Sequence, residues 1–193
     1  MSTERSGVLL IKPPRFEDSR GWFSETYNYE KYCDRGLATR FVQDNHSLSR
    51  SAGVVRGLHF QAPPHGQAKL VSCIRGAIFD VCVDVRRGSP TYGKWAGATL
   101  SAENGHQLFI PVGFAHGFVT LEPGTEVFYK VSAYYSAASE GGIAWDDADL
   151  AIDWPLPETG PILSDKDSLL PPLSAFDSPF DYDGQPLEDI RDA

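Results

Sequence analysis

A run of chemically active side chains, Arg56-Gly57-Leu58-His59-Phe60-Gln61, stands in an apolar, strand-like stretch of this 193-residue chain. Its histidine has an ordinary pKa near ~6.5, which suits a base that works at neutral pH. Lys69 follows closely and opens a second apolar run. A base that accepts a proton and an ammonium that holds negative charge together favour removal of a proton beside a carbonyl. The competing interpretations are a structural histidine, the commoner case for a lone histidine in a strand, and a surface lysine.

Tyr129 supplies a possible acid for the same chemistry. It lies in the alternating stretch 126–132, on the same face as Val127 and Val131. If that face is the interior of a closed sheet, Tyr129 is either a core tyrosine or an acid that faces His59 across a cavity. In the second arrangement one residue removes a proton and the other returns it from the opposite side, which inverts a stereocentre.

A histidine base usually has a carboxylate on its other ring nitrogen, which fixes the tautomer and supports the imidazolium. Asp84 and Asp167 are both candidates, and spacing does not choose between them. His116 stands between aromatic residues and glycines in the run 111–118. It is interpreted as a ligand contact, as a support for such a dyad, or as a structural turn residue.

The position of Arg56 raises a geometric problem. Strict alternation along a strand places Arg56 and His59, three residues apart, on opposite faces. A bulge at Gly57 would re-aim one of them, and only with such a bulge do both line one pocket.

A metal site is the main alternative chemistry for a jelly-roll protein. It would need two histidines two residues apart, a nearby carboxylate and a third histidine on a later strand. Here Gln61 stands two residues after His59, and Gln67 stands where the carboxylate is expected. Only His116 remains, so we expect no metal ion.

The elements that must position these groups are short strands. The stretch 77–85 alternates with period two and places Phe79, Val81, Val83 and Val85 on one face, opposite two aspartates. Further strands are expected at 22–27, 41–47, 96–100, 107–111, 115–121 and 126–133, and a short helix at 29–37. Many short strands and few helices predict a mainly β protein, a closed antiparallel jelly-roll barrel.

The chain beyond Ser136 changes character. It predicts a packed extension with short helices, followed by an acidic and loosely held segment at 179–193. No repeat or long linker is visible, so we expect residues 1–193 to form a single domain. The polar residues of 41–47 are unusual for a core strand and are more natural in the lining of a cavity.

Charge and composition limit the partners. The net charge of −9 argues against broad nucleic-acid binding, which needs a basic face. A locally basic pocket for a small anion remains open, with Arg20, Arg56 and Lys69 as candidates. No membrane-spanning run or signal peptide is visible, and the three cysteines have no paired spacing. These features favour a cytoplasmic protein that is not attached to a membrane.

Several motifs, in order and over nearly the whole chain, resemble the dTDP-4-dehydrorhamnose 3,5-epimerase family, the RmlC-type cupins. The matching motifs are 16–21, 41–45, 56–61, 111–118, the paired tyrosines 134–135, and 164–167. The resemblance implies a dimeric jelly-roll enzyme that acts without a metal or other cofactor. It also implies a nucleotide-linked 4-keto-6-deoxyhexose as substrate, with thymidine as the usual nucleotide.

The resemblance further implies individual roles. His59 matches the base, Asp167 its carboxylate partner, Tyr129 the acid on the opposite face of the sugar, and Lys69 the group that steadies the C4 enolate. The expected substrate contacts within one chain are Arg56, Gln43, Asn45, His116 and Tyr135, with the assignment of Tyr135 open to an exchange with Tyr134. The residues expected to reach the site from a partner subunit are Arg20, Phe23 and Glu25.

The implied chemistry is consistent, because carbons 3 and 5 both flank the C4 ketone and are acidified by the same carbonyl. The leading hypothesis is therefore conversion of dTDP-4-dehydro-6-deoxy-D-glucose to dTDP-4-dehydro-L-rhamnose. The alternatives are an epimerase that inverts only C3 or only C5, and a non-catalytic cupin that binds a sugar or nucleotide. A mere binder has no need for an acid and a base on opposite faces.

Overall fold

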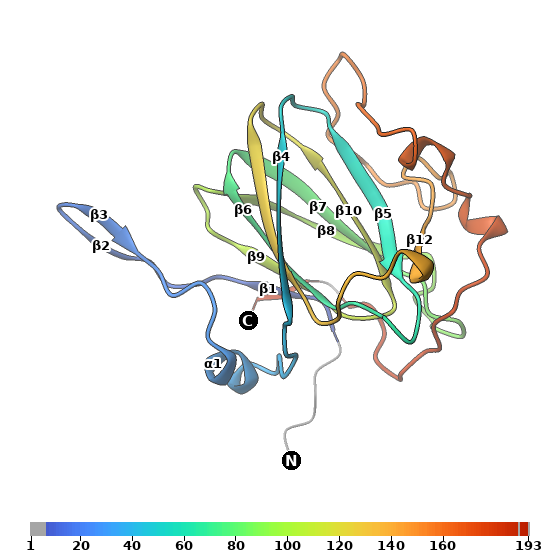
Figure 1. The fold of residues 1–193 in the computed structure, drawn as a ribbon, viewed down its shortest axis with the longest axis horizontal. Coiled ribbons are helices and arrows are strands. Elements are labelled where there is room, and N and C mark those ends of the chain that lie inside the picture. Colours follow the sequence, from blue (N-terminus) through green and yellow to red (C-terminus); the bar gives the residue numbers. More distant parts are fainter. Residues whose placement is uncertain (1–6, 189, 193) are drawn as a thin grey trace.

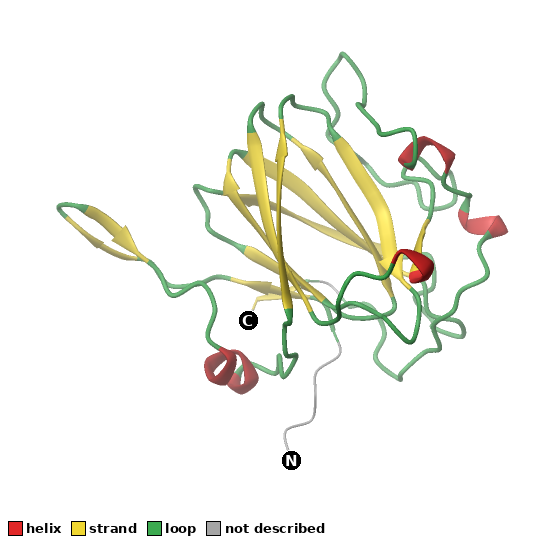
Figure 2. Ribbon diagram, viewed as in Figure 1, coloured by secondary structure: helices red, strands yellow, loops and turns green. Residues whose placement is uncertain are grey.

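The computed structural model describes residues 7–188 and 190–192, and these residues form mainly β structure (Figures 1 and 2). The strands are β1 (Leu9–Ile11), β2 (Phe16–Asp18), β3 (Gly21–Phe23), β4 (Gln43–Ser49), β5 (Val55–Gln61), β6 (Lys69–Arg75), β7 (Ala77–Asp84), β8 (Trp95–Ser101), β9 (Gln107–Ile110), β10 (Phe114–Thr120), β11 (Thr125–Val131), β12 (Glu140–Gly142) and β13 (Arg191–Asp192). The helical elements are α1 (Tyr29–Asp34) and the 3₁₀ turns η1 (Ala137–Ser139), η2 (Asp167–Leu169) and η3 (Leu173–Ala175).

Two sheets face each other and enclose the barrel interior. One has the strand order β13-β1-β9-β6-β11-β4 and the other β12-β5-β10-β7-β8. Their strand pairs are antiparallel except for β1 and β13. The prediction of a mainly β, antiparallel jelly-roll barrel is therefore confirmed, with a C-terminal extension whose helical part consists of the 3₁₀ turns η2 and η3.

Strand β7 is buried on both faces, which explains its long apolar pattern. Val81, Val83 and Val85 share one face, as alternation predicts, but they pack under the C-terminal extension rather than inside the barrel. The opposite face carries Ile78 and Cys82 into the apolar part of the barrel interior. Asp80 and Asp84, predicted to lie on that opposite face, are fully buried.

The N-terminal region differs in part from the expected pattern. The strand predicted at 22–27 ends at Phe23, and β3 pairs with β2 in a hairpin that projects from the barrel (Figure 1, left). The predicted helix at 29–37 is confirmed as α1 but ends earlier, at Asp34. Asn28 caps its start, and Gly36 adopts a φ of 88°, which favours glycine where the chain leaves the helix.

The segment after Pro179 differs from the loosely held tail that its composition suggests. Phe180 is only 5% exposed and packs in the core under the extension. Asp183 forms an ion pair of 2.7 Å with the buried Arg86, and Leu187 packs near the apolar barrel interior. These contacts hold the described part of the segment against the barrel. Among the described residues, no helix is long and apolar enough to cross a membrane.

Candidate active site

A bulge in β5 places two polar side chains in the barrel interior. His59 pairs with His116 of β10, whereas Arg56 pairs with Phe118, so three steps along β5 match two steps along β10. The extra residue restores Arg56 and His59 to the same side of the strand. Both line one cavity, which confirms the expected bulge.

Glycines make this bulge possible. Gly57 has a φ of 124°, and a Cβ atom added there would lie 2.5 Å from the Cα of Gly117 on the neighbouring strand. A Cβ atom on Gly117 would lie 2.7 Å from the carbonyl oxygen of Arg56. The two backbones therefore approach more closely than any side chain at either position would allow.

The cavity has two lobes that share His59, Lys69 and Tyr129. The first, the Arg56 lobe, measures about 150 Å³ and is completed by Ser47, Arg56, His116 and Phe118. The second, the Tyr135 lobe, measures about 170 Å³ and is completed by Gln43, Asn45, Phe60, Gln61, Gln67, Tyr135 and Glu140. Three of the four predicted catalytic side chains therefore lie where the lobes meet, and the fourth, Asp167, lines neither lobe.

His59 and Asp167 form a close pair, with 2.6 Å between Nε2 and Oδ1. The carboxylate can only accept, so Nε2 carries the proton and Nδ1 is left as the basic nitrogen. Burial lowers the pKa of His59, and the Asp167 charge and hydrogen bond oppose that shift. The imidazole is therefore neutral near pH 7, the state that a base requires. The other candidate, Asp84, instead accepts from Nε and Nη2 of Arg86 at 2.9 and 2.8 Å.

Lys69 lies beside the base and is held by a buried dyad. Its Nζ lies 3.4 Å from the carbonyl oxygen of His59 and 3.4 Å from Nδ1 of His116. Nε2 of His116 donates to Oδ1 of Asp80 at 2.7 Å. Burial lowers the pKa of Lys69 to about 8, against the opposing charges of Asp80 and Glu140. Sequence reasoning had not assigned Asp80 a role, although alternation along the strand places it on the face opposite the valines, which in the structure is the interior face.

Tyr129 comes from the opposite wall of the barrel. It lies on β11 in the six-stranded sheet, whereas His59 lies on β5 in the five-stranded sheet. Burial raises the pKa of Tyr129, with Arg56 opposing the shift. The phenol is therefore protonated at neutral pH and able to donate.

The Tyr135 lobe has a polar floor and an aromatic rim. Gln43 donates from Nε2 to Oδ1 of Asn45 at 2.9 Å and accepts from the backbone N–H of Tyr135 at 3.1 Å. The Tyr135 hydroxyl donates to Oε2 of Glu140 at 3.0 Å, and Lys166 forms an ion pair of 2.5 Å with Oε1 of Glu140. Tyr135 lines the lobe and Tyr134 does not.

Sequence reasoning missed Glu140, which lines this lobe, and Lys166, which pairs with it. Glu140 and Lys166 follow the long strands of the barrel, where hydrophobic periodicity gives no direction for a side chain. The motif 164–167 contains Lys166, but its spacing alone does not reveal the distant glutamate with which it pairs.

The structure does not bring Arg20 and Phe23 of the hairpin, or Glu25 just after it, to this cavity. Arg20 pairs with Asp18 on its own hairpin at 2.5 Å, and Glu25 pairs with Lys31 at 2.9 Å. None of the three lines either lobe. Within the described residues, no group of three or more His, Cys, Asp and Glu side chains is placed to hold a metal ion.

The chain matches known proteins over most of its length. Residues 2–175 match the family model described as dTDP-4-dehydrorhamnose 3,5-epimerase. A protein of that name from Sinorhizobium fredii is 54% identical over 176 residues, which cover 91% of this chain and 89% of that protein.

Two solved structures are informative. An epimerase from Legionella pneumophila in complex with dTDP-4-keto-L-rhamnose is 46% identical, with a TM-score of 0.84, over 88% of this chain and 89% of that one. A 3'-monoepimerase from Streptomyces bikiniensis in complex with dTDP-quinovose is 35% identical, with a TM-score of 0.81, over 87% of this chain and 84% of that one. The fold is therefore shared with an enzyme that inverts one centre, but the identity to it is lower.

Proposed function

The chain belongs to the dTDP-4-dehydrorhamnose 3,5-epimerase family, and we propose that it inverts carbons 3 and 5 of dTDP-4-dehydro-6-deoxy-D-glucose to give dTDP-4-dehydro-L-rhamnose. The observation that carries this function is the arrangement at the junction of the lobes. A neutral imidazole and a protonated phenol come from opposite sheets, and an ammonium lies beside the imidazole. That arrangement matches inversion at a carbon next to a carbonyl.

Each inversion follows one scheme. Nδ1 of His59 takes the proton from the carbon beside the ketone, and the electron pair of that bond moves toward the C4 oxygen. Lys69 stabilises the resulting enolate, and Asp167 stabilises the imidazolium. Tyr129 donates its proton to the opposite face of the same carbon. Proton exchange with solvent then restores His59 and Tyr129, and the ring adjusts for the second carbon.

The two lobes divide the substrate between them. The keto sugar occupies the Arg56 lobe and the junction, where it meets the acid and the base. The nucleotide extends into the Tyr135 lobe, where Tyr135 lies against the thymine and Gln43 and Asn45 contact polar groups. Arg56 and Lys166 supply positive charge for the diphosphate on a protein of net charge −9.

A second copy of the chain completes this site in our proposal. The hairpin exposes Phe16 and Phe23, which are 62% and 68% accessible, and it projects away from the barrel (Figure 1). Arg20 and Glu25 lie at the same end of the chain. We infer that the hairpin crosses to a partner barrel and brings Arg20, Phe23 and Glu25 to its Tyr135 lobe.

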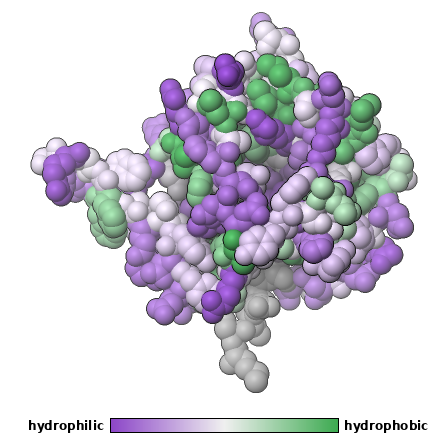
Figure 3. All heavy atoms as spheres, in the orientation of Figure 1, coloured by the Kyte–Doolittle hydropathy of each residue, from purple (hydrophilic) through white to green (hydrophobic). Residues whose placement is uncertain are grey.

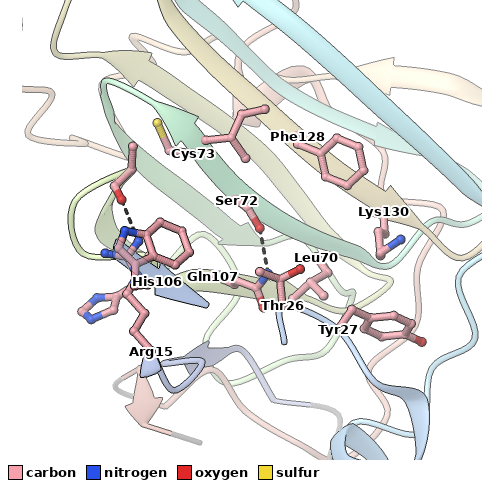
Figure 4. A pocket seen from close by; sticks show the side chains of 14 residues that line it. Arg15, Thr26, Tyr27, Leu70, Ser72, Cys73, His106, Gln107, Phe128 and Lys130 are labelled. Atoms are coloured by element: carbon pink, nitrogen blue, oxygen red, sulfur yellow. Dashed lines mark hydrogen bonds between the residues drawn. The ribbon is translucent and has the colours of Figure 1, made fainter. Parts of the chain in front are cut away.

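The outer face of the six-stranded sheet provides a surface for that partner. Leu48 and Ile74 are 52% and 49% exposed there. On the face of the molecule that Figure 3 shows, hydrophobic side chains stand exposed among hydrophilic ones. Beside them, Leu70, Ser72 and Phe128 line a groove that Arg15 and Tyr27 of the N-terminal region border (Figure 4). The groove and the exposed hairpin have complementary apolar character, which supports a homodimer.

Subunit mixing tests the shared site. His59→Ala and Arg20→Ala each inactivate one part of the site, and in a swapped dimer those parts come from different chains. After random exchange of equal amounts, half of the dimers are heterodimers, and each heterodimer has one intact site of two. Mixing the two inactive variants should therefore restore up to about a quarter of wild-type activity. No recovery after verified subunit exchange would contradict the shared site, as would a stable, active monomer in light scattering.

The activity itself is tested by incubating the protein with dTDP-4-dehydro-6-deoxy-D-glucose and identifying the product by NMR. The L-configured 4-keto sugar should form with the wild type and not with His59→Ala, whose circular dichroism should be unchanged. Binding of substrate without turnover would favour a non-catalytic cupin. A product inverted at one carbon would favour a 3-only or 5-only epimerase. The cytoplasmic location and single-domain organisation remain predictions.

A further inference from the structure

Gln61 uses its whole side-chain amide to join two loops at the rim of the Tyr135 lobe. It is 4% exposed, on β5 two residues after the base. Nε2 donates to the carbonyl oxygens of His65 and Tyr134 at 2.7 and 3.2 Å, and Oε1 accepts from the backbone N–H of Ser136 at 2.7 Å. Two acceptors face the nitrogen and one donor faces the oxygen, so the amide has one satisfied orientation.

Gln67 acts on the same segment from the other side of the loop. Its Nε2 donates to the carbonyl oxygen of Ala133 at 2.8 Å. Together the two glutamines fix three backbone groups within residues 133–136. In a metal-binding jelly roll these two positions would carry ligands, and here both amides hold the chain instead.

Tyr135 lies inside the segment that is held. Its ring belongs to a side chain that is 59% exposed, so the barrel core does not fix its position. Its own contacts are the N–H bond to Gln43 and the hydroxyl bond to Glu140. The residues on either side of it are fixed by Gln61, through the Tyr134 carbonyl and the Ser136 N–H. The ring therefore stands on a backbone that is held at both of its peptide neighbours.

From this geometry we propose that Gln61 and Gln67 are positioning residues for nucleotide binding, which hold the 133–136 segment so that Tyr135 meets the base of the nucleotide. The inference rests on the proposed function, because it requires the nucleotide in the Tyr135 lobe. Ordering of the segment before binding removes an entropy cost that the ligand would otherwise bear. The glutamines thus act on affinity through Tyr135 and not on the proton transfers at the junction of the lobes.

The test measures dTDP affinity by calorimetry and turnover of the keto sugar in the same variants. Gln61→Met and Gln67→Met keep the volume of the side chain and remove its hydrogen bonds. The double variant removes the three hydrogen bonds that hold the segment and should weaken dTDP binding by about tenfold, because only part of the stabilisation of the segment is expressed as affinity for the ligand. KM should rise in proportion, with a much smaller change in kcat at saturating substrate. A loss confined to kcat would overturn the proposal.

Combining the glutamine substitution with a Tyr135 variant tests whether the glutamines act through the Tyr135 ring. If the glutamines act through its ring, adding Gln61→Met to Tyr135→Ala should lower dTDP affinity little further. Additive losses would overturn the proposal, because they would mean that Gln61 contacts the ligand independently or acts through general stability. Gln61→Glu should bind dTDP more weakly than Gln61→Met, since a carboxylate oxygen would then face two carbonyl oxygens.

Thr120→Val is the matched control for lost buried hydrogen bonds. Thr120 is fully buried, donates to the carbonyl of Ser51 at 2.8 Å and accepts from the N–H of Val54 at 3.0 Å, outside both lobes. It should lower the melting temperature without changing dTDP affinity. An equal loss of affinity in Thr120→Val would overturn the proposal. If the wild type turns over the keto sugar and the glutamine variants bind dTDP normally, this inference alone is overturned. If the wild type binds no dTDP, the proposed function is overturned together with the inference.

Discussion

The Lys69 ammonium donates a hydrogen bond to Nδ1 of His116, with 3.4 Å between Nζ and the ring nitrogen. His116 can accept there because its other nitrogen donates to Asp80 at 2.7 Å. Burial lowers the pKa of His116, and the charge of Lys69 lowers it further, whereas Asp80 raises it. The net shift is downward, so the ring stays neutral. The dyad therefore fixes the direction of the ammonium without competing for the proton. Lys69 therefore stays at the junction of the two lobes, where the proposed enolate would form.

Removal of this ammonium should slow catalysis more than it weakens binding. Lys69→Met keeps the stem of the side chain and loses the charge that stabilises the enolate. We expect kcat to fall by about 10²–10³-fold, or about 3–4 kcal/mol in the barrier, as for other oxyanion donors. Single-turnover kinetics at saturating substrate measures this change. An unchanged kcat would exclude Lys69 from the chemical step.

The pKa directions predict a bell-shaped pH profile for kcat/KM. His59 must be neutral, and its pKa is lowered below its ordinary 6.5, so the acid limb should lie below pH 6.5. Lys69 must be charged, and its pKa is about 8, so activity should fall as the pH rises through about 8. In Lys69→Met the alkaline limb near pH 8 should disappear from the residual activity. A limb that persists there would belong to another group.

Tyr129→Phe should separate proton removal from inversion. The variant keeps the base and the ammonium but has no acid on the opposite face of the sugar. In heavy water we expect deuterium to enter the substrate through His59 with retention of configuration, while formation of the L-sugar falls at least about 100-fold. Mass spectrometry and NMR of the recovered sugar measure both outcomes. Inversion at the wild-type rate would remove Tyr129 as the acid.

The close approach of β5 and β10 should not tolerate a methyl group. Gly117→Ala would place Cβ 2.7 Å from the Arg56 carbonyl oxygen and 3.2 Å from the Cα of Gly57. We expect a loss of about 1–3 kcal/mol in the free energy of unfolding and a large loss of activity, because the bulge that aligns Arg56 with His59 would shift. Urea denaturation measures the first effect. Gly7→Ala, with nothing within 4 Å of the added Cβ, is the matched control, and equal effects of the two substitutions would contradict the argument.

Alternation along single strands was sufficient to predict several interior residues. It places Tyr129 on the face of Val127 and Val131, and it places Asp80 opposite the valines of β7, as the structure does. It does not reveal which side of β7 faces the barrel, since both sides are buried. That choice depends on the C-terminal extension, which covers the outer face only after the chain has folded.

Pairings between distant parts of the chain were harder to predict from the sequence. Asp84 and Asp167 are equivalent candidates by type. In the structure Asp84 pairs with Arg86, two residues along the chain, whereas tertiary structure brings Asp167 to His59 across 108 positions. Glu140 and Lys166 were missed for the same reason, because they meet outside the regular strands. Spacing alone left the bulge at Gly57 open, since it showed only that Arg56 and His59 could not share a face of a regular strand. The family resemblance favoured the bulge, because it made Arg56 a ligand contact.

The most direct measurement of the central claim is proton exchange by NMR, with dTDP-4-dehydro-6-deoxy-D-glucose and the wild-type protein in heavy water. Epimerisation through a C4 enolate predicts deuterium at both C3 and C5 as the L-sugar forms, since each carbon must lose its proton to His59 and regain one from exchanged Tyr129. The result that would contradict the account is measurable binding of the substrate with no deuterium at either carbon. Deuterium and inversion at a single carbon would instead restrict the enzyme to one centre.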